Sequence, residues 1–106
     1  MDKREIQEKL IGLGGHVANK GFPCIVEAIK FIKDDNKNVR FTGKGGVYKA
    51  VADELGMTIT SVERSIRYEI ERIYDENYDP PAWMIPQKKA GKLPNMEFLK
   101  RCAMFL

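Results

Sequence analysis

Residues 52–67 read ADELGMTITSVERSIR, a stretch whose spacing is typical of a helix-turn-helix. In this motif a small residue in the first helix, here Ala52, lets the second helix cross closely. Gly56 follows four positions later and is the residue type that most easily takes a left-handed turn. The apolar residues that plug the corner and pack the second helix on the first are Leu55, Met57, Val62 and Ile66. We therefore predict a helix-turn-helix whose second helix begins near Ile59.

The outer face of that second helix carries residues that suit DNA readout, because this face of the motif enters the major groove. The candidate base contacts, at helical spacing, are Thr60, Ser61, Glu63, Arg64, Arg67 and Tyr68. Arginine can donate two hydrogen bonds to guanine, glutamate can accept one from cytosine, and hydroxyl groups can contact bases or phosphates. The alternative is a solvated face in which Glu63 and Arg67 pair across one helical turn. The motif spacing favours DNA contact, at a site containing both G and C.

Basic residues gather next to the motif. No acid lies between residues 37 and 49, and the candidate phosphate contacts there are Lys37, Arg40, Lys44 and Lys49. This run precedes and enters the first helix of the motif, whose unpaired N-terminal N–H groups commonly face a phosphate. A second basic loop holds Lys88, Lys89 and Lys92, where a solvated surface and a flanking phosphate contact are equally good interpretations. The glycines at 43–46 lack the spacing of a nucleotide-binding loop.

Apolar periodicity places the remaining helices. It predicts helices over about 2–13, 22–36, 47–55 and 59–76, one turn around Trp83, and a last helix that Asn95 would cap. No strand pattern is present, so the fold class is all-α, with five to six short helices that include the helix-turn-helix. A chain of 106 residues has the length of one domain. We expect a single DNA-binding domain over residues 1–106, around one core.

The composition argues against several other functions. Eighteen basic and fifteen acidic residues give a formal charge of +3, which permits an acidic partner. The two cysteines have apolar neighbours and are expected as buried free thiols, while His16, the one histidine, lies in a glycine-rich loop. We therefore expect no metal site, no cofactor and no catalytic residues. The chain also lacks an apolar run that could span a membrane or direct secretion, which predicts a cytoplasmic protein.

The sequence resembles a known family, the C-terminal DNA-binding domain of stage zero sporulation protein A, a response regulator of endospore-forming bacteria. The resemblance extends from about residue 13 almost to the end of the chain. Residues 20–22 and 27–29, KGF and EAI, are similar to the family's K-G-Y and E-A-I. Residues 47–52, VYKAVA, are similar to L-Y-P-x-I-A, and PNMEF at 94–98 to P-T-N-S-E-F. SVERSIR at 61–67 resembles the family's R-V-E-R-A-I-R and is the most specific part.

This resemblance implies a six-helix effector domain whose fourth helix reads the major groove, with Glu63, Arg64 and Arg67 at DNA-contacting positions. Ser61 stands where the family has a base-contacting arginine, so the family's operator sequence does not carry over. We expect no receiver domain in these residues, which would make the chain either an excised effector domain or a stand-alone regulator.

The prediction is a sequence-specific transcription regulator that binds double-stranded DNA. RNA polymerase and a second copy of the chain on DNA are further candidate partners. The alternative is a helical protein-interaction module that uses the same scaffold to present Tyr68, Tyr74, Phe98 and Phe105. The two functions differ in the outer face of helix 59–76, which a protein-binding module would make apolar.

Overall fold

The computed structural model describes residues 2–34, 40–43, 45–77, 79–86 and 92–106. In these ranges the chain forms helices and no strand, which confirms the predicted all-α class. The elements in chain order are α1 (Lys3–Gly12), α2 (Gly21–Asp34), α3 (Val47–Leu55), α4 (Ile59–Glu76), the 3₁₀ turn η1 (Ala82–Met84) and α5 (Asn95–Phe105). None of the described helices is long and apolar enough to cross a bilayer.

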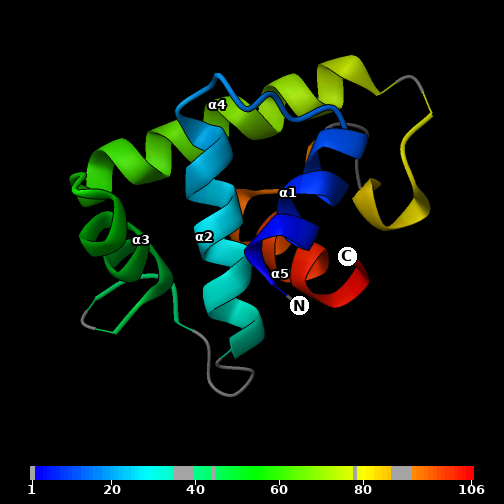
Figure 1. Cartoon of the computed structure of the whole chain (residues 1–106). Coiled ribbons are helices and arrows are strands. Elements are labelled where there is room, and N and C mark those ends of the chain that lie inside the picture. The colour runs from blue at the N-terminus through cyan, green and yellow to red at the C-terminus, as the bar shows by residue number, and fades with distance from the viewer. Residues whose placement is uncertain (1, 35–39, 44, 78, 87–91) are drawn as a thin grey trace.

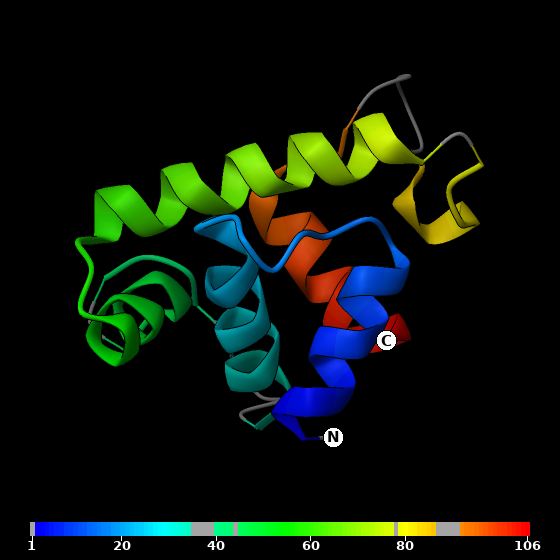
Figure 2. The ribbon, with the colours of Figure 1, turned by 45° about the horizontal axis from the view of Figure 1, so that its top comes forward.

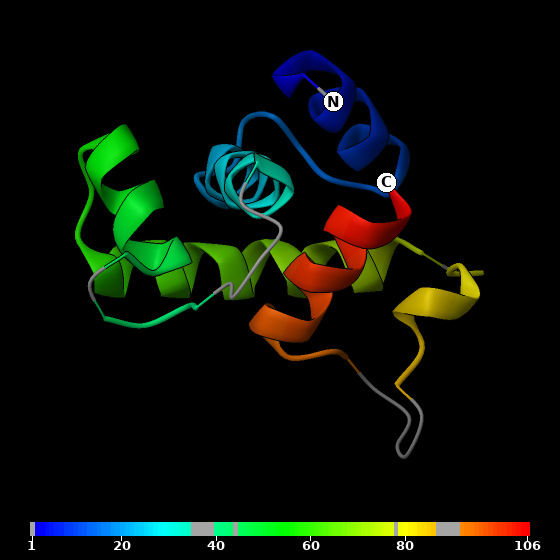
Figure 3. The ribbon, with the colours of Figure 1, turned by 90° about the horizontal axis from the view of Figure 1, so that it is seen from below.

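Helix α2 lies at the centre and packs against α1, α3, α4 and α5 (Figure 1). Seen along its axis, α2 has α3 on one side and α1 and α5 on the other (Figure 3). Helix α4 lies across one side of the molecule, with the other helices beneath it (Figure 2). On its side away from these helices, α4 has exposed side chains that include Thr60, Arg64 and Tyr68.

One apolar core holds these helices together, with contributions from all five α-helices. The stripes predicted for the two longest helices are buried, each residue being 7% exposed or less: Ile25, Ala28, Ile29 and Ile32 on α2, and Val62, Ile66, Ile70 and Ile73 on α4. Each large aliphatic side chain buried in this way contributes about 1.5–3 kcal/mol to folding. The α4 stripe fixes which face of that helix stays in solvent.

The N-terminus of α5 differs from the prediction. Asn95 is the first helical residue and not the cap, because Pro94 takes the cap position with an extended backbone and no side-chain hydrogen bond. The Asn95 side chain instead donates from Nδ2 to the carbonyl oxygen of Glu63, 3.2 Å away on α4. Helix α2 ends at Asp34 in the described ranges, and its predicted end at Asn36 lies outside them.

Gly21 lets α2 begin directly against α4. A Cβ atom at this position would lie 2.2 Å from the backbone oxygen of Ser65 and 2.6 Å from the Cβ of Glu69. No side chain fits at these distances without moving one of the two helices. The crossing of α2 and α4 therefore depends on this glycine.

Both cysteines are buried free thiols, as predicted. The Cys24 sulfur on α2 lies 3.6 Å from the Met57 sulfur at the helix-turn-helix corner. Burial raises the pKa of the Cys24 thiol to about 11 and also raises that of Cys102. These thiols are packing residues in their protonated form.

Candidate nucleic-acid interface

The corner between α3 and α4 has the predicted helix-turn-helix geometry. Gly56 takes the left-handed conformation, with φ +65° and ψ +38°, and its N–H donates to the carbonyl of Ala52. The N–H of Met57 donates to the same oxygen at 2.9 Å, which ends α3. Thr58 then caps α4, its Oγ1 accepting from the N–H of Ser61 at 3.1 Å.

The solvent side of α4 is polar and centred on Arg64. Thr60, Ser61, Arg67 and Tyr68 are exposed around it, and Glu63 is partly buried at the border. The opposite side of the helix carries the buried stripe, so the predicted base-contacting residues share one outward surface. Among the residues that the structure describes, Arg64 has no hydrogen bond or ion pair that would hold it in place.

Glu63 and Arg67 form an ion pair, as expected under the alternative interpretation that this face is solvated. Arg67 Nη1 lies 3.0 Å and 3.3 Å from the two carboxylate oxygens of Glu63, and the Arg67 guanidinium stands 5.8 Å from the ring centre of Tyr68. Because the pair is solvent-exposed on one helix, it contributes only a few tenths of a kcal/mol. DNA could therefore replace it at small cost.

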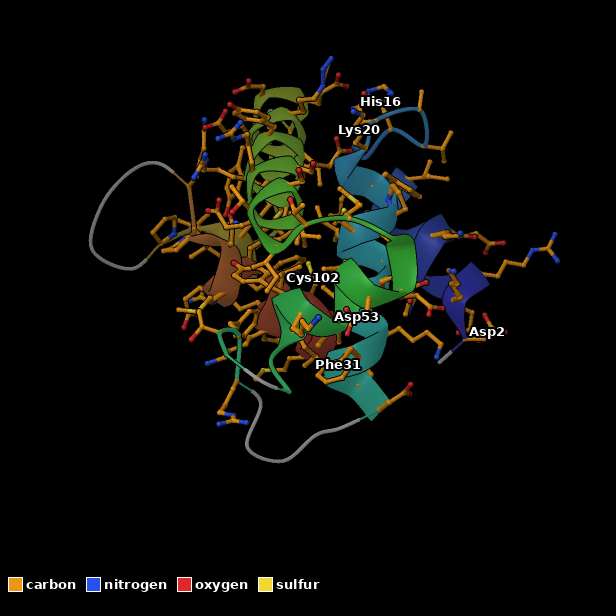
Figure 4. All side chains as sticks on the ribbon, turned by 90° about the vertical axis from the view of Figure 1, so that its left-hand side faces the viewer. Asp2, His16, Lys20, Phe31, Asp53 and Cys102 are labelled. Carbon is orange, nitrogen blue, oxygen red and sulfur yellow. The ribbon has the colours of Figure 1, made fainter. Side chains whose placement is uncertain are left out.

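The candidate phosphate contacts divide into two groups. Lys37, Lys44, Lys88 and Lys89 lie outside the described residues. Arg40, Lys49 and Lys92 are described and exposed. Lys49 Nζ is 2.7 Å from Oδ1 of Asp53, four residues later on α3, a partner that the sequence interpretation did not consider. Figure 4 labels Asp53 on the outer side of that helix.

The expectation that unpaired N–H groups of α3 face a phosphate is wrong for two of them. The N–H of Val47 donates to the carbonyl of Arg40 at 2.8 Å, and that of Tyr48 to the carbonyl of Phe41 at 3.3 Å. The reason is that the segment before α3 folds back onto the helix end. Gly46 allows this approach, since a Cβ there would lie 2.8 Å from the Phe41 oxygen.

Two hollows flank the outward surface of α4. The first, of about 330 Å³, lies between α4 and the segment before α5, and it includes Arg67 and Lys92 in its walls. The second, of about 430 Å³, lies between α4 and the loop before α2, and it includes Lys20, Arg64 and Arg72. Lys92 thus lines the same hollow as Arg67, a predicted base-contacting residue. Lys20 and Arg72 were not among the predicted site residues.

The loop before α2 is fixed to α4 by a buried carboxylate. Glu69 is 1% exposed, and its two oxygens accept from the N–H of His16 and from Nδ2 of Asn19, both at 2.9 Å. His16 itself is exposed, with Nε2 3.1 Å from a Glu76 oxygen. In the described parts of the chain, no three His, Cys, Asp or Glu side chains gather as a metal site would require.

A comparison with known protein families finds one family whose model matches nearly the whole chain. Residues 6–106 match the family model described as "Sporulation initiation factor Spo0A C terminal". The match begins within α1 and covers every later helix to the end of α5. No curated protein matches the chain significantly.

Proposed function

The chain belongs to the family of the C-terminal domain of sporulation initiation factor Spo0A, the DNA-binding effector domain of a sporulation transcription factor, and on this premise we propose that it reads DNA sequence with α4. The chain is thus a DNA-binding transcription regulator. The proposal concerns how it binds: α3 lies over the DNA backbone, and the outward surface of α4 enters the major groove.

The observation that carries the proposal is the position of Arg64. Its side chain is exposed at the middle of the outward surface, on the second helix of a helix-turn-helix, and has no partner in the described parts of the chain. An unpaired arginine can donate two hydrogen bonds to O6 and N7 of guanine without first breaking a contact. Glu63, Arg67, Thr60, Ser61 and Tyr68 surround it as further base contacts, and Arg40, Lys49 and Lys92 as phosphate contacts.

The residues named for the alternative function, a protein-interaction module, do not form one exposed surface in the described structure. Phe98 is fully buried, and the Tyr74 hydroxyl donates to the carbonyl of Met84 at 2.6 Å. Only Tyr68 and Phe105 of that residue set are exposed, 54% and 55%, and they lie on different helices. The outward surface of α4 is otherwise polar, which favours nucleic acid.

The proposal extends to partners and place of action. A second copy of the chain would occupy an adjacent half-site on the same DNA, as helix-turn-helix proteins commonly do. RNA polymerase would be the partner of the DNA-bound chain, and the cytoplasm, where this DNA lies, the place of action. We assign residues 1–106 to one DNA-binding domain with no cofactor or catalytic step. Analytical sedimentation with DNA that carries one or two binding sites tests whether two copies of the chain bind side by side.

The test of readout by Arg64 begins with a randomised DNA pool from which the wild-type chain selects its site. Arg64→Ala should lower affinity for the selected DNA by about 1–3 kcal/mol and relax the preference at one base pair. Arg4→Ala serves as the control, because Arg4 has a side chain 88% exposed at the end of α1 remote from α4 (Figure 2). Equal losses by Arg64→Ala on every DNA sequence would contradict readout by this residue.

A further inference from the structure

The hollow between α4 and the loop before α2 has the character of an anion site. Among the described residues, three cations line it, Lys20 from the loop and Arg64 and Arg72 from α4, and the one acid is Glu69. Glu69 is 1% exposed and both its oxygens already accept hydrogen bonds from the loop. The surface of the hollow therefore carries an excess of positive charge.

None of the three cations has a hydrogen bond or an ion pair with a residue that the structure describes. They differ in this from Lys49 and Arg67, whose charges are paired with Asp53 and Glu63 on their own helices. Unpaired cations in one hollow repel one another, and an anion placed among them would relieve this repulsion. The hollow thus carries a positive charge that no other part of the described structure neutralises.

The position of Lys20 is set by the fold. Gly21, the next residue, touches the backbone of Ser65, and Glu69 binds the loop at Asn19, the residue before. Lys20 is therefore held between two fixed points on the flank of α4 (Figure 4). Arg72 lies eight residues after Arg64 on α4, about 12 Å along the axis, and lines the same hollow.

The width of the major groove determines which part of the DNA lies against this flank of α4. The major groove is about 12 Å wide, close to the diameter of about 10–12 Å of a helix with its side chains. A helix seated there has one sugar-phosphate backbone along each flank. On the proposed function, one backbone meets the hollow that holds Lys92, and the other meets the hollow that holds Lys20 and Arg72.

We propose that Lys20 and Arg72 bind phosphates of the DNA strand that borders α4 on the side of the loop before α2, while Arg64 reaches the bases. This inference rests on the proposed function. Phosphate contacts carry no base information, so the two residues set the position and orientation of α4 in the groove.

The experiment measures affinity against salt, with the selected DNA and with an unrelated duplex of equal length. Lys20→Gln and Arg72→Gln should each lower affinity for both duplexes by the same factor and flatten the slope of log K against log salt by about 0.9. Raising salt from about 50 to 200 mM should then cost the wild type about 3.5-fold more affinity than either variant. Lys20→Arg and Arg72→Lys should keep the wild-type slope.

Arg4→Gln is the matched control, because it removes the same charge from the remote end of α1, and its slope should equal that of the wild type. Wild-type slopes in Lys20→Gln and Arg72→Gln would overturn this inference while leaving DNA binding intact. A change in base preference would overturn it too, since it would make these residues base readers. Failure of the wild-type chain to bind any duplex would instead overturn the proposed function. Thermal melting of each variant separates loss of contact from loss of fold.

Discussion

The guanidinium of Arg67 lies 3.0 Å from the carboxylate of Glu63, one helical turn earlier on the outward surface of α4. Two residues predicted to contact bases therefore hold each other in the free chain, while Arg64, between them in sequence, has no partner among the residues that the structure describes. The pair limits the rotamers of Arg67 before DNA arrives, and it places a negative charge at the border of a cationic surface. Glu63 can act as a cytosine acceptor only if Arg67 releases it or shares it.

The first prediction follows from this pair. Glu63→Gln should change the free energy of unfolding by less than about 0.5 kcal/mol, because the pair is exposed and confined to one helix. Affinity for unrelated DNA should rise, since one negative charge leaves the surface, and preference should relax at one base pair. Urea unfolding and selection from a randomised pool measure the two effects. Unchanged base preference would exclude Glu63 from the readout.

The second prediction concerns the crossing of α2 and α4. Gly21→Ala should destabilise the fold by about 2 kcal/mol or more, because the new Cβ would lie 2.2 Å from a backbone oxygen that cannot move alone. Gly12→Ala is the control: it adds the same methyl group within α1 where nothing lies within 4 Å, and should stabilise by about 0.5–1 kcal/mol. Thermal melting compares them. Equal melting temperatures would contradict the close crossing.

Much of this fold is predictable from the sequence because the signals are local. Val62, Ile66 and Ile70 repeat at the helical period, and only one face of α4 can then be buried. Gly56 marks the corner because a left-handed residue is needed there and glycine adopts it without strain. Asn95 shows where local signals fail. Pro94 and Asn95 are adjacent, and their local preferences did not decide which of them would precede the helix.

The parts of the site that the sequence did not predict depend on contacts between distant residues. Glu69 lies on α4 among exposed acids and arginines, and only its bonds to His16 and Asn19 make its burial favourable. Lys20 lines the hollow beside α4 because Gly21 brings its loop against that helix, which no periodicity reveals. Arg72 could have been predicted from the sequence, because it lies eight residues after Arg64 on the same helix.

The third prediction is a loss of stability in alkali. The pKa of the Cys24 thiol is raised from 9.0 to about 11 by burial, so above about pH 9 the unfolded chain loses this proton while the folded chain keeps it. Stability should therefore fall as pH rises between these two pKa values, by roughly 3 kcal/mol in total from this residue.

Urea unfolding of the wild type and of Cys24→Ala between about pH 8 and 11 isolates this effect, because other titrating groups cancel in the difference. The alanine variant should begin less stable and lose less stability with pH. Parallel curves for the two proteins would show that Cys24 ionises as readily in the folded chain as in the unfolded one.

The last prediction concerns Ser61, which is exposed beside Arg64. At the position of Ser61, the family motif that the sequence resembles has an arginine that can reach a guanine. Ser61→Arg should leave folding nearly unchanged, because the cap of α4 uses the Ser61 backbone N–H and not its hydroxyl. It should raise affinity for a family-type operator by about 1–3 kcal/mol and raise affinity for the site selected by the natural chain by less. Binding titrations with both duplexes at one salt concentration measure the difference. Equal gains on the two DNAs would mean that the new charge acts through phosphates alone, and that the register of α4 in the groove differs from the one proposed.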